Sequence, residues 1–246
     1  MTGASSGIGL ATARRLASDG FAVLAVGRDA GTLDRVCQDI ASAGGTAAPF
    51  AADVTADDGP RAIVARATET LGGIDAIVNA AGVIASASVA ETTDAAWDAM
   101  MAVNVRAPFR LIREAAAALV ARKGAVVNVS SVAGLRAFPG VASYAVSKAA
   151  VDQLTRVAAL DFAPHGVRVN AVNPGVVVTN LHRRGGMDEQ KYADFLERSK
   201  TTHPLGRPGR PEEIADLIGY LLSPAAGWIT GETIAIDGGR HLTCLR

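Results

Sequence analysis

Short apolar runs alternate with stretches of helical periodicity along most of this chain. The apolar runs are bounded by glycine or polar residues, and several are continuous, which is typical of strands buried on both faces of a parallel sheet. They cover residues 21–26, 46–52, 74–79, 124–130, 167–172 and 233–236. Helical patterns fall between them, at residues 10–17, 30–43, 57–71, 93–122, 143–162 and 211–222. This alternation predicts right-handed crossovers and a mainly parallel sheet with helices on both faces.

One long segment, residues 176–210, shows no helical or strand pattern and holds several turn-forming residues, among them Gly185, Gly186 and Pro204. Structureless segments of this length in compact domains usually act as lids or are disordered. The sequence shows no internal repeat and no domain linker. We therefore expect one α/β domain over residues 1–246, in which residues 176–210 form a substrate loop or lid.

The composition fits many close contacts between helices and a sheet, because aromatic residues make up only 4% of the chain. Basic and acidic residues number 24 each, so no net field would recruit nucleic acid or an anionic membrane. Cys37 and Cys244 form no metal-ligand cluster or disulfide framework, and no signal peptide or membrane-spanning stretch is evident. We expect a cytoplasmic protein without a metal, acting on a small molecule.

Residues 2–9 read Thr-Gly-Ala-Ser-Ser-Gly-Ile-Gly and are followed by a helical pattern. Three glycines at this spacing let the backbone turn tightly and approach a pyrophosphate, while the unpaired N–H groups of the following helix face the anion. The stretch predicts a dinucleotide-binding loop. With the alternating pattern, it predicts a doubly wound fold of the Rossmann type.

A loop of this kind normally leaves the end of a buried central strand, yet Met1 is the residue before Thr2. We expect the first strand to be absent from the chain as given, which would leave its neighbours with unpaired backbone groups at a cost of about 1–3 kcal/mol for each buried group. Our hypothesis is that the native chain continues upstream of Met1. If the short form is real, an inactive regulatory or structural subunit that binds the cofactor on the same fold is the alternative function.

The reactive residues concentrate after residue 128. Tyr144 and Lys148 are four residues apart on a predicted helix, so their side chains share one face and can converge on one point. A nearby ammonium stabilises a phenolate, and each unit of pKa shift is worth about 1.4 kcal/mol. Ser131 follows a predicted strand at the sheet's carboxyl edge, where ligands bind in such folds, and its hydroxyl could hold a carbonyl or alcohol oxygen.

The ordered set of motifs resembles the short-chain dehydrogenase/reductase family over the whole length of the chain. The motifs are Thr2-Gly3-x-x-x-Gly7-x-Gly9, Asp53-Val54, Asn79-Ala80-Ala81-Gly82, Asn104, Ser131, Tyr144-x-x-x-Lys148 and Asn173-Pro174-Gly175 followed by Thr179. A glycine motif alone is weak evidence, but this ordered set is specific. The resemblance implies an oxidoreductase that interconverts a ketone and a secondary alcohol with a nicotinamide cofactor.

The resemblance also implies a role for each catalytic position. Tyr144 would be the general acid in reduction and the base in oxidation. Lys148 would lower the pKa of Tyr144 and hold the nicotinamide ribose, while Ser131 would fix and polarise the reacting oxygen. Asn104 would break the regular hydrogen bonding of the long helix and hold a water that connects Lys148 to solvent.

Cofactor contacts are likewise carried over from the family. Asp53 and Val54 would contact adenine, and Val176 and Thr179 would hold the carboxamide end. The full set of cofactor-binding residues that we expect is Gly3, Ser5, Ser6, Gly7, Ile8, Gly9, Arg28, Asp53, Val54, Asn79, Ala80, Gly82, Tyr144, Lys148, Pro174, Gly175, Val176 and Thr179.

The choice of dinucleotide depends on the end of the second strand. Sites selective for the unphosphorylated ribose place Asp or Glu about 20 residues beyond the glycines, but here Gly27 and Arg28 follow Val26. A guanidinium there could bind a 2′-phosphate, which favours NADP(H). Asp29 and Ser6 leave NAD(H) as the alternative.

The sequence says less about the substrate and the assembly. Leu135, Phe138 and Val141 are candidates for an apolar pocket, and steroid, sugar, acyl thioester and diketone substrates all stay open. Arg183-Arg184 is interpreted as a solvated loop, with contact to an anionic substrate as the alternative. His165, His182, His203 and His241 show no carboxylate partner in register and are interpreted as surface or packing residues. Small residues at 115–118 and 149–150, on helices through which relatives assemble, predict a homo-oligomer, either a tetramer or a dimer.

Overall fold

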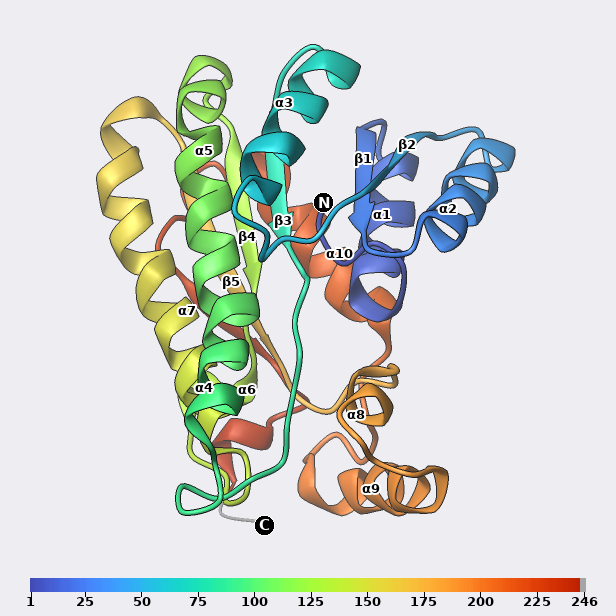
Figure 1. Cartoon of the computed structure of the whole chain (residues 1–246), viewed down its shortest axis with the longest axis vertical. Coiled ribbons are helices and arrows are strands. Elements are labelled where there is room, and N and C mark those ends of the chain that lie inside the picture. The colour runs from blue at the N-terminus through green and yellow to red at the C-terminus, as the bar shows by residue number, and fades with distance from the viewer. Residues whose placement is uncertain (244–246) are drawn as a thin grey trace.

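The computed structural model describes residues 1–243, which form a parallel sheet with helices on both faces (Figure 1). The strands are β1 (Ala22–Gly27), β2 (Thr46–Ala51), β3 (Ala76–Asn79), β4 (Ala125–Val129), β5 (Arg168–Pro174) and β6 (Thr233–Ile236). Every pair among them is parallel, in the ladders β1-β2 and β3-β4-β5-β6. The predicted strands and the doubly wound α/β fold are confirmed.

The first two residues lie between the two ladders. Thr2 forms isolated parallel bridges with Val26 and Asn79, and its N–H donates to the carbonyl of Val78 at 3.0 Å. The carbonyl of Met1 accepts from the N–H of Val26 at 2.9 Å. Within residues 1–243, this short stretch joins β1 to β3 at the place where a central strand was expected to be missing.

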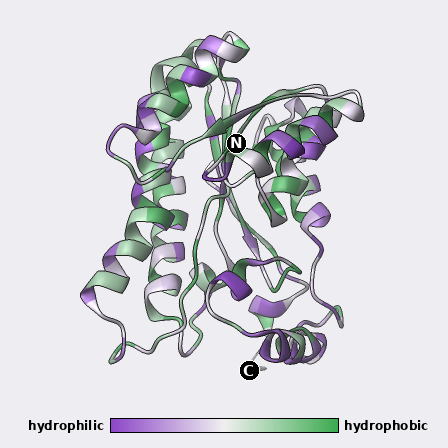
Figure 2. Ribbon diagram, turned by 45° about the vertical axis from the view of Figure 1, so that its right-hand side comes forward, coloured by the Kyte–Doolittle hydropathy of each residue, from purple (hydrophilic) through white to green (hydrophobic). Residues whose placement is uncertain are grey.

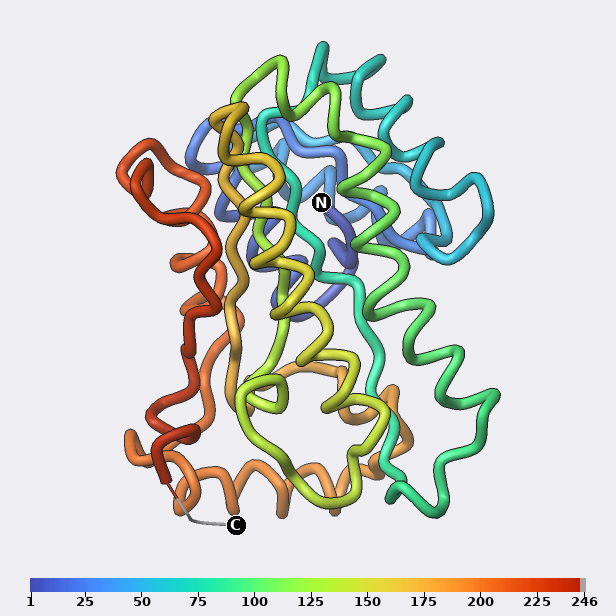
Figure 3. Tube along the Cα trace, turned by 90° about the vertical axis from the view of Figure 1, so that its left-hand side faces the viewer, coloured from blue at the N-terminus to red at the C-terminus, as the bar shows by residue number. Residues whose placement is uncertain are grey.

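Helices cover the sheet in two layers, each with its own apolar core. The helices are α1 (Gly7–Ser18), α2 (Ala30–Ser42), α3 (Gly59–Leu71), α4 (Asp94–Met101), α5 (Ala107–Arg122), α6 (Val132–Leu135), α7 (Ala142–Phe162), α8 (Leu181–Arg184), α9 (Glu189–Thr202) and α10 (Pro211–Leu222), with the short helical turns η1 (Ala102–Arg106), η2 (Ala163–His165), η3 (Pro224–Ala226) and η4 (Arg240–Leu242). One core joins α1, α2 and α10 to the sheet, and the other joins α3, α5 and α7 to its opposite face. Figure 3 shows α5 and α7 running side by side over that second face.

The prediction of a single long helix over residues 93–122 is wrong in one respect, because a π-helical segment interrupts it. The Thr93 hydroxyl caps α4 by accepting from the N–H of Ala96, and α5 ends at Arg122, so both outer limits are close to the prediction. Between them, η1 is a π-helical segment that contains Asn104. The break in the regular hydrogen bonding that the family resemblance implied at Asn104 is therefore confirmed.

The segment 176–210 has more regular structure than the sequence led us to expect, because it contains α8 and α9. The carboxylate of Asp188 caps α9 by accepting from the N–H of Lys191 at 2.8 Å. Few residues of α9 are apolar, so the helix lacks the continuous apolar stripe that reveals a helix in a sequence. Figure 2 shows α9 largely in hydrophilic colours.

Two further expectations concern cysteines and membranes. Cys37 is buried in the core beside α1, whereas Cys244 lies outside the described residues. Among residues 1–243, every helix is too short or too polar to cross a lipid bilayer.

Candidate active site

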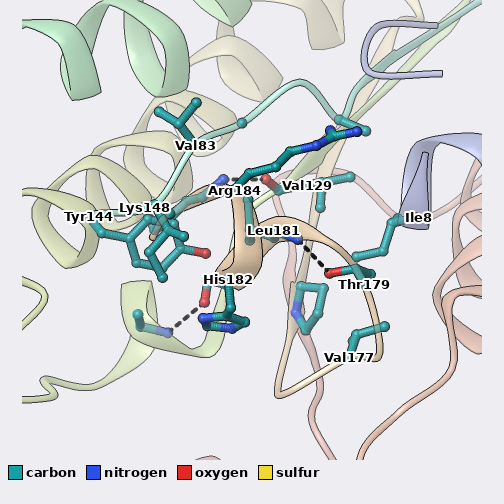
Figure 4. Close-up of a pocket in the computed structure, with 18 of the residues that line it drawn as sticks. Ile8, Val83, Val129, Tyr144, Lys148, Val177, Thr179, Leu181, His182 and Arg184 are labelled. Atoms are coloured by element: carbon teal, nitrogen blue, oxygen red, sulfur yellow. Dashed lines mark hydrogen bonds between the residues drawn. The ribbon is translucent and has the colours of Figure 1, made fainter. Parts of the chain in front are cut away.

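A cleft of about 1330 Å³ runs along the carboxyl ends of the strands, from the glycine-rich loop to α9. Sites for drug-sized ligands usually measure about 300–1,000 Å³, so this cleft has room for a dinucleotide and a second reactant. In parallel α/β sheets, ligands bind at this edge because the loops that follow the strands converge there. Figure 4 shows the part of the cleft that contains Tyr144 and Lys148.

The glycine-rich loop has the backbone conformation of a phosphate-binding turn. Gly3 and Gly7 have φ of +68° and +54°, a region that favours glycine. A Cβ on Gly9 would lie 2.0 Å from the carbonyl oxygen of Gly3, so no other residue fits there. Ser6 caps α1 without a side-chain hydrogen bond, which leaves the N–H groups of the first turn available to an anion. These features fit a pyrophosphate.

The far end of the cleft bears one cation and one carboxylate, Arg28 and Asp53. Asp53 accepts hydrogen bonds from the N–H and hydroxyl of Thr55 at 2.8 and 2.7 Å, which lower the pKa of its carboxyl group. Asp29 is turned toward α2 instead, where its carboxylate accepts from the N–H of Thr32 at 2.6 Å. Among the described residues, Arg28 therefore lines the cleft and Asp29 does not.

Ser131, Tyr144 and Lys148 line the same part of the cleft, as the sequence predicted, and all three are buried. Tyr144 and Lys148 lie one turn apart on α7, and the Lys148 Nζ is 5.7 Å from the centre of the Tyr144 ring. Ser131 is the N-cap residue of α6, and its Oγ accepts from the N–H of Ala133 at 3.1 Å. The Lys148 ammonium also donates to the carbonyl of Val129 at 2.8 Å, which fixes its position.

Burial shifts the pKa values of the two titratable groups in opposite directions. Burial lowers the pKa of Lys148 to about 8, although the negative charge of Asp152 opposes the shift. Burial raises the pKa of Tyr144, and a hydrogen bond with Ser131 opposes that shift. Desolvation of the phenolate is the largest influence on the pKa of Tyr144, and the expected lowering of this pKa by Lys148 stays a prediction.

A buried network of hydrogen bonds contacts the backbone of Ser131 and Lys148. The Asn173 amide donates to both carboxylate oxygens of Asp152, at 3.1 and 2.9 Å, and to the carbonyl of Ser131 at 2.9 Å. The Ser130 hydroxyl donates to the carbonyl of Lys148 at 3.1 Å. We did not single out Asp152 from the sequence, although it extends the row of residues four apart that begins with Tyr144 and Lys148.

Asn104 lies behind the cleft rather than in its lining. Its Oδ1 accepts from the N–H of Val83 at 3.0 Å, and its amide donates to the carbonyl of Val83 and to the Ser147 hydroxyl, each at 3.0 Å. Asn104 thereby ties η1 to the loop after β3 and to α7. The water that it was expected to hold stays a prediction.

All of the expected cofactor residues line the cleft except Asn79. The Asn79 amide donates to Oδ1 of Asn128 at 2.8 Å beneath the sheet edge. Of the expected substrate pocket, Phe138 and Val141 line the cleft, whereas Leu135 is 37% exposed and lies outside its lining. The placement of Leu135 in the pocket is therefore wrong, because the short helix α6 turns its side chain outward.

The lid segment contributes side chains to the cleft that were not among the predicted site residues. They are Leu181, His182, Arg184, Phe195, Arg198, Ser199, Thr202 and His203. His182 packs on Phe195 with ring centres 4.4 Å apart, and burial lowers the pKa of His182. The interpretation of His182 as a surface or packing residue is thus incomplete, because it faces the cleft (Figure 4).

Two buried side chains of the lid hold the loop that follows β5. The Tyr192 hydroxyl donates to the carbonyl of Thr179 at 2.9 Å and accepts from its N–H at 3.2 Å. The His203 Nε2 accepts from the N–H of Val176 at 3.1 Å, while its Nδ1 lies 2.9 Å from the carbonyl of Ser199. No local sequence pattern reveals contacts that span this many residues. We name Tyr192 and His203 the lid clamp.

Another expectation about histidine fails at the end of the described chain. His241 was thought to lack a carboxylate partner, but its Nδ1 lies 2.9 Å from Oδ2 of Asp237. The pair is one helical turn apart, which the sequence could have shown. Asp237 also accepts from the backbone N–H groups of Gly239 and His241, so the contact organises this turn.

Comparisons with known proteins agree with the geometry. The family model described as "Enoyl-(Acyl carrier protein) reductase" matches residues 3–241. The chain is 38% identical to 2-(S)-hydroxypropyl-CoM dehydrogenase 3 of Xanthobacter autotrophicus over 97% of this chain and 94% of the relative. It is 40% identical to galactitol 2-dehydrogenase (L-tagatose-forming) of Cereibacter sphaeroides, over 97% and 92% of the two chains.

Solved structures give the same result at the level of the fold. A short-chain type dehydrogenase/reductase from Mycobacterium marinum superposes with a TM-score of 0.90 at 37% identity, covering 99% of this chain and 94% of the other. A structure from Caenorhabditis elegans described as a short-chain dehydrogenase/reductase with cofactor superposes with a TM-score of 0.91 at 37% identity, covering 98% and 94%.

Proposed function

Since the chain belongs to the short-chain dehydrogenase/reductase family, we propose that it interconverts a ketone and a secondary alcohol with NADP(H). The family establishes the broader activity, which is that of an oxidoreductase of alcohol and carbonyl groups that uses NAD(P). The observation that carries the proposal is the convergence of Ser131, Tyr144 and Lys148 on the cleft that begins at the glycine-rich loop. Equal numbers of acidic and basic residues support a small-molecule substrate over nucleic acid or membrane partners.

The residues that line the cleft fit a dinucleotide along its length. The glycines and the first turn of α1 would hold the pyrophosphate, Asp53 and Val54 the adenine, and Val176 and Thr179 the carboxamide end. When bound, the nicotinamide supplies the acceptor or donor of a hydride. Lys148 would hold the nicotinamide ribose through its ammonium.

Tyr144 would give a proton to the carbonyl oxygen during reduction and take one from the alcohol during oxidation. Ser131 would donate a hydrogen bond to the same oxygen, which fixes its position and stabilises the negative charge that develops on it. The Lys148 ammonium would stabilise the phenolate that Tyr144 becomes after it gives up its proton. Asn104 would hold a water that connects Lys148 to solvent, while its contacts with the Val83 backbone and the Ser147 hydroxyl fix its position.

The preference for NADP(H) over NAD(H) is supported by the positions of Arg28 and Asp29. Arg28 lines the cleft, and its guanidinium can pair with a 2′-phosphate. Asp29 would favour NAD(H) if it faced the ribose, but its carboxylate caps α2. Asp53, the carboxylate in this part of the cleft, is already engaged by Thr55.

The test is absorbance at 340 nm with a panel of ketones and alcohols, run with NADPH and NADH in parallel. We expect turnover with NADPH that Tyr144→Phe abolishes, while the variant still binds NADPH. Binding of a dinucleotide without turnover by the unchanged protein would support a regulatory role in place of an enzyme. Equal efficiency with NADH would contradict the cofactor preference alone.

A further inference from the structure

The catalytic half of the cleft is lined by cations. Arg136, Arg184, Arg198 and Arg240 all belong to its lining, in addition to Lys148. Among the described residues, the one carboxylate of the lining is Asp53, which lies at the opposite, adenosine end. The chain as a whole has a net charge of zero, so this imbalance is local.

Within the lid segment, the arginines that line the cleft differ from the other cations in their ion pairing. The remaining Arg and Lys side chains between residues 181 and 213 each have a carboxylate within 4 Å; the pairs are Arg183–Glu189, Lys191–Asp188, Lys200–Glu197, Arg207–Glu213 and Arg210–Glu213. Arg184 and Arg198 form no such pair within the part of the chain that the structure describes. The lid cations that line the cleft are thus the ones left without a counter-charge.

Arg136 and Arg240 add two further positive charges to the same half of the cleft. Their guanidinium carbons lie 5.3 and 5.2 Å from the centre of the Phe138 ring. Arg136 donates to the backbone carbonyl of Arg240 at 3.1 Å, and Arg240 donates to that of Thr202 at 3.2 Å. Burial lowers the pKa of Arg240, and the positive charges of Arg136 and Arg198 lower it further, so these charges lie close enough to repel one another.

Apolar surface lies between these cations and the reactive hydroxyl groups. His182 and Phe195 pack together in the lid, and Phe138 and Val141 line the neighbouring wall. Figure 4 shows Leu181, His182 and Arg184 projecting from α8 into the pocket that also holds Tyr144 and Lys148. A ligand here would meet polar reactive groups, apolar side chains and guanidinium groups.

We propose that the substrate is an anionic ketone or alcohol, whose carboxylate, sulfonate or phosphate group is bound by Arg184 and Arg198 while its carbonyl or hydroxyl lies at Tyr144. Guanidinium groups bind such anions through paired, charge-assisted hydrogen bonds, which are worth most where water is partly excluded. The inference rests on the proposed oxidoreductase function and names its substrate class. It replaces the interpretation of Arg184 as part of a solvated loop.

The test compares straight-chain oxo-carboxylates of increasing length with their methyl esters. We expect kcat/KM for the best oxo-carboxylate to exceed that of its ester at least tenfold. Arg184→Gln and Arg198→Gln should each lower kcat/KM for the acid by about ten- to a hundredfold, the usual range for one hydrogen bond to a charged group, and leave the ester unchanged. Sulfonate and phosphate analogues of the best acid then identify the anion.

Lys200→Gln provides the matched control, because Lys200 lies on the same helix as Arg198, pairs with Glu197 and does not line the cleft. We expect it to leave acid and ester turnover unchanged. The affinity for NADPH should stay constant in all three variants. Weakened NADPH binding in Arg184→Gln or Arg198→Gln, with no change in the acid-to-ester ratio, would overturn the proposal and assign the arginine to the cofactor phosphates.

Calorimetry with NADPH-saturated protein separates the subsite from the chemistry. If the acids bind more tightly than the esters and the arginine variants remove the difference, the anion subsite stands, even if no ketone is reduced and the proposed reaction fails. If acids and esters bind equally, or if the difference survives in both variants, the subsite is wrong even though ketones are turned over.

Discussion

At the scale of single residues, burial shifts the pKa values of the two titratable groups of the site. Tyr144 and Lys148 are both buried, and burial raises the pKa of the phenol and lowers that of the ammonium to about 8. Since both groups are protonated at neutral pH, the site holds a proton donor beside a cation. This is the state that carbonyl reduction requires.

We predict that kcat/KM for ketone reduction is constant at neutral pH and falls as the pH rises through about 8. The sign follows from the pKa of Lys148: the ammonium is present below about pH 8 and is lost above it. A pH–rate profile measures this directly. Lys148→Met should react more slowly at every pH and lack the fall near pH 8. A fall of unchanged position in that variant would assign the titration to another group.

The Arg28 side chain gives a second prediction at this scale. Arg28→Ala should raise the KM for NADPH about tenfold or more and leave the KM for NADH unchanged, because only NADPH carries the 2′-phosphate. Arg35→Ala is the control, since Arg35 lies nearby on α2, bonds the Thr32 hydroxyl and does not line the cleft. If both cofactors weaken equally in Arg28→Ala, the phosphate contact is wrong.

At the scale of elements, the lid clamp couples α9 to the loop after β5. Tyr192 is bonded to the backbone of Thr179, and His203 accepts from the N–H of Val176. Both clamped positions are ones that we expect at the carboxamide end of the cofactor. Any movement of α9 is therefore transmitted to the part of the cleft where the nicotinamide would lie.

We predict that His203→Leu weakens NADPH binding about tenfold and lowers the melting temperature, because it removes the acceptor for a buried backbone N–H at a cost of about 1–3 kcal/mol. His203→Gln keeps an acceptor and should recover much of the cofactor affinity. Fluorescence titration with NADPH and thermal unfolding measure the two effects. If His203→Leu loses stability with unchanged NADPH affinity, the residue is structural only.

The elements that sequence could predict are those whose signal is local. Short, mainly apolar runs identified every strand, and the spacing of Tyr144 and Lys148 placed both side chains in one site. The polar helix α9 and the π-helical turn at Asn104 carry no such periodicity, although the resemblance supplied a break at Asn104. The clamp through His203 and the arginine-lined wall of the cleft depend on tertiary contacts, which no spacing along the chain records.

At the scale of the whole molecule, the net charge of the chain is zero, although the charges that line its cleft are mostly positive. Acidic and basic residues balance at 24 each, yet the lining of the catalytic half has no carboxylate among the described residues. Carboxylates outside the cleft compensate the positive charges, as in the ion pairs of the remaining lid cations. Net charge therefore argues against large polyanionic partners but carries no information about a small anionic substrate.

The outer face of α5 and α7 leads to the last prediction. Phe109 on α5 is 44% exposed, and Val146, Val157 and Leu160 on α7 are 46%, 46% and 77% exposed. The two helices lie side by side (Figure 3), and each contributes exposed apolar side chains to the surface. Apolar surface of this kind marks contacts between proteins, and a second copy of the chain is the partner that the family resemblance implies.

We predict that the protein is a homo-oligomer and that Phe109→Asp with Leu160→Asp converts it to a monomer, because a carboxylate buried at the interface would lose its hydration without gaining a partner. Size-exclusion chromatography with light scattering measures the mass, and thermal unfolding checks that the variant stays folded. Trp228→Ser tests a different surface, since Trp228 is fully exposed beyond α10. If Trp228→Ser dissociates the oligomer and the double variant does not, subunits meet through the α10 edge instead.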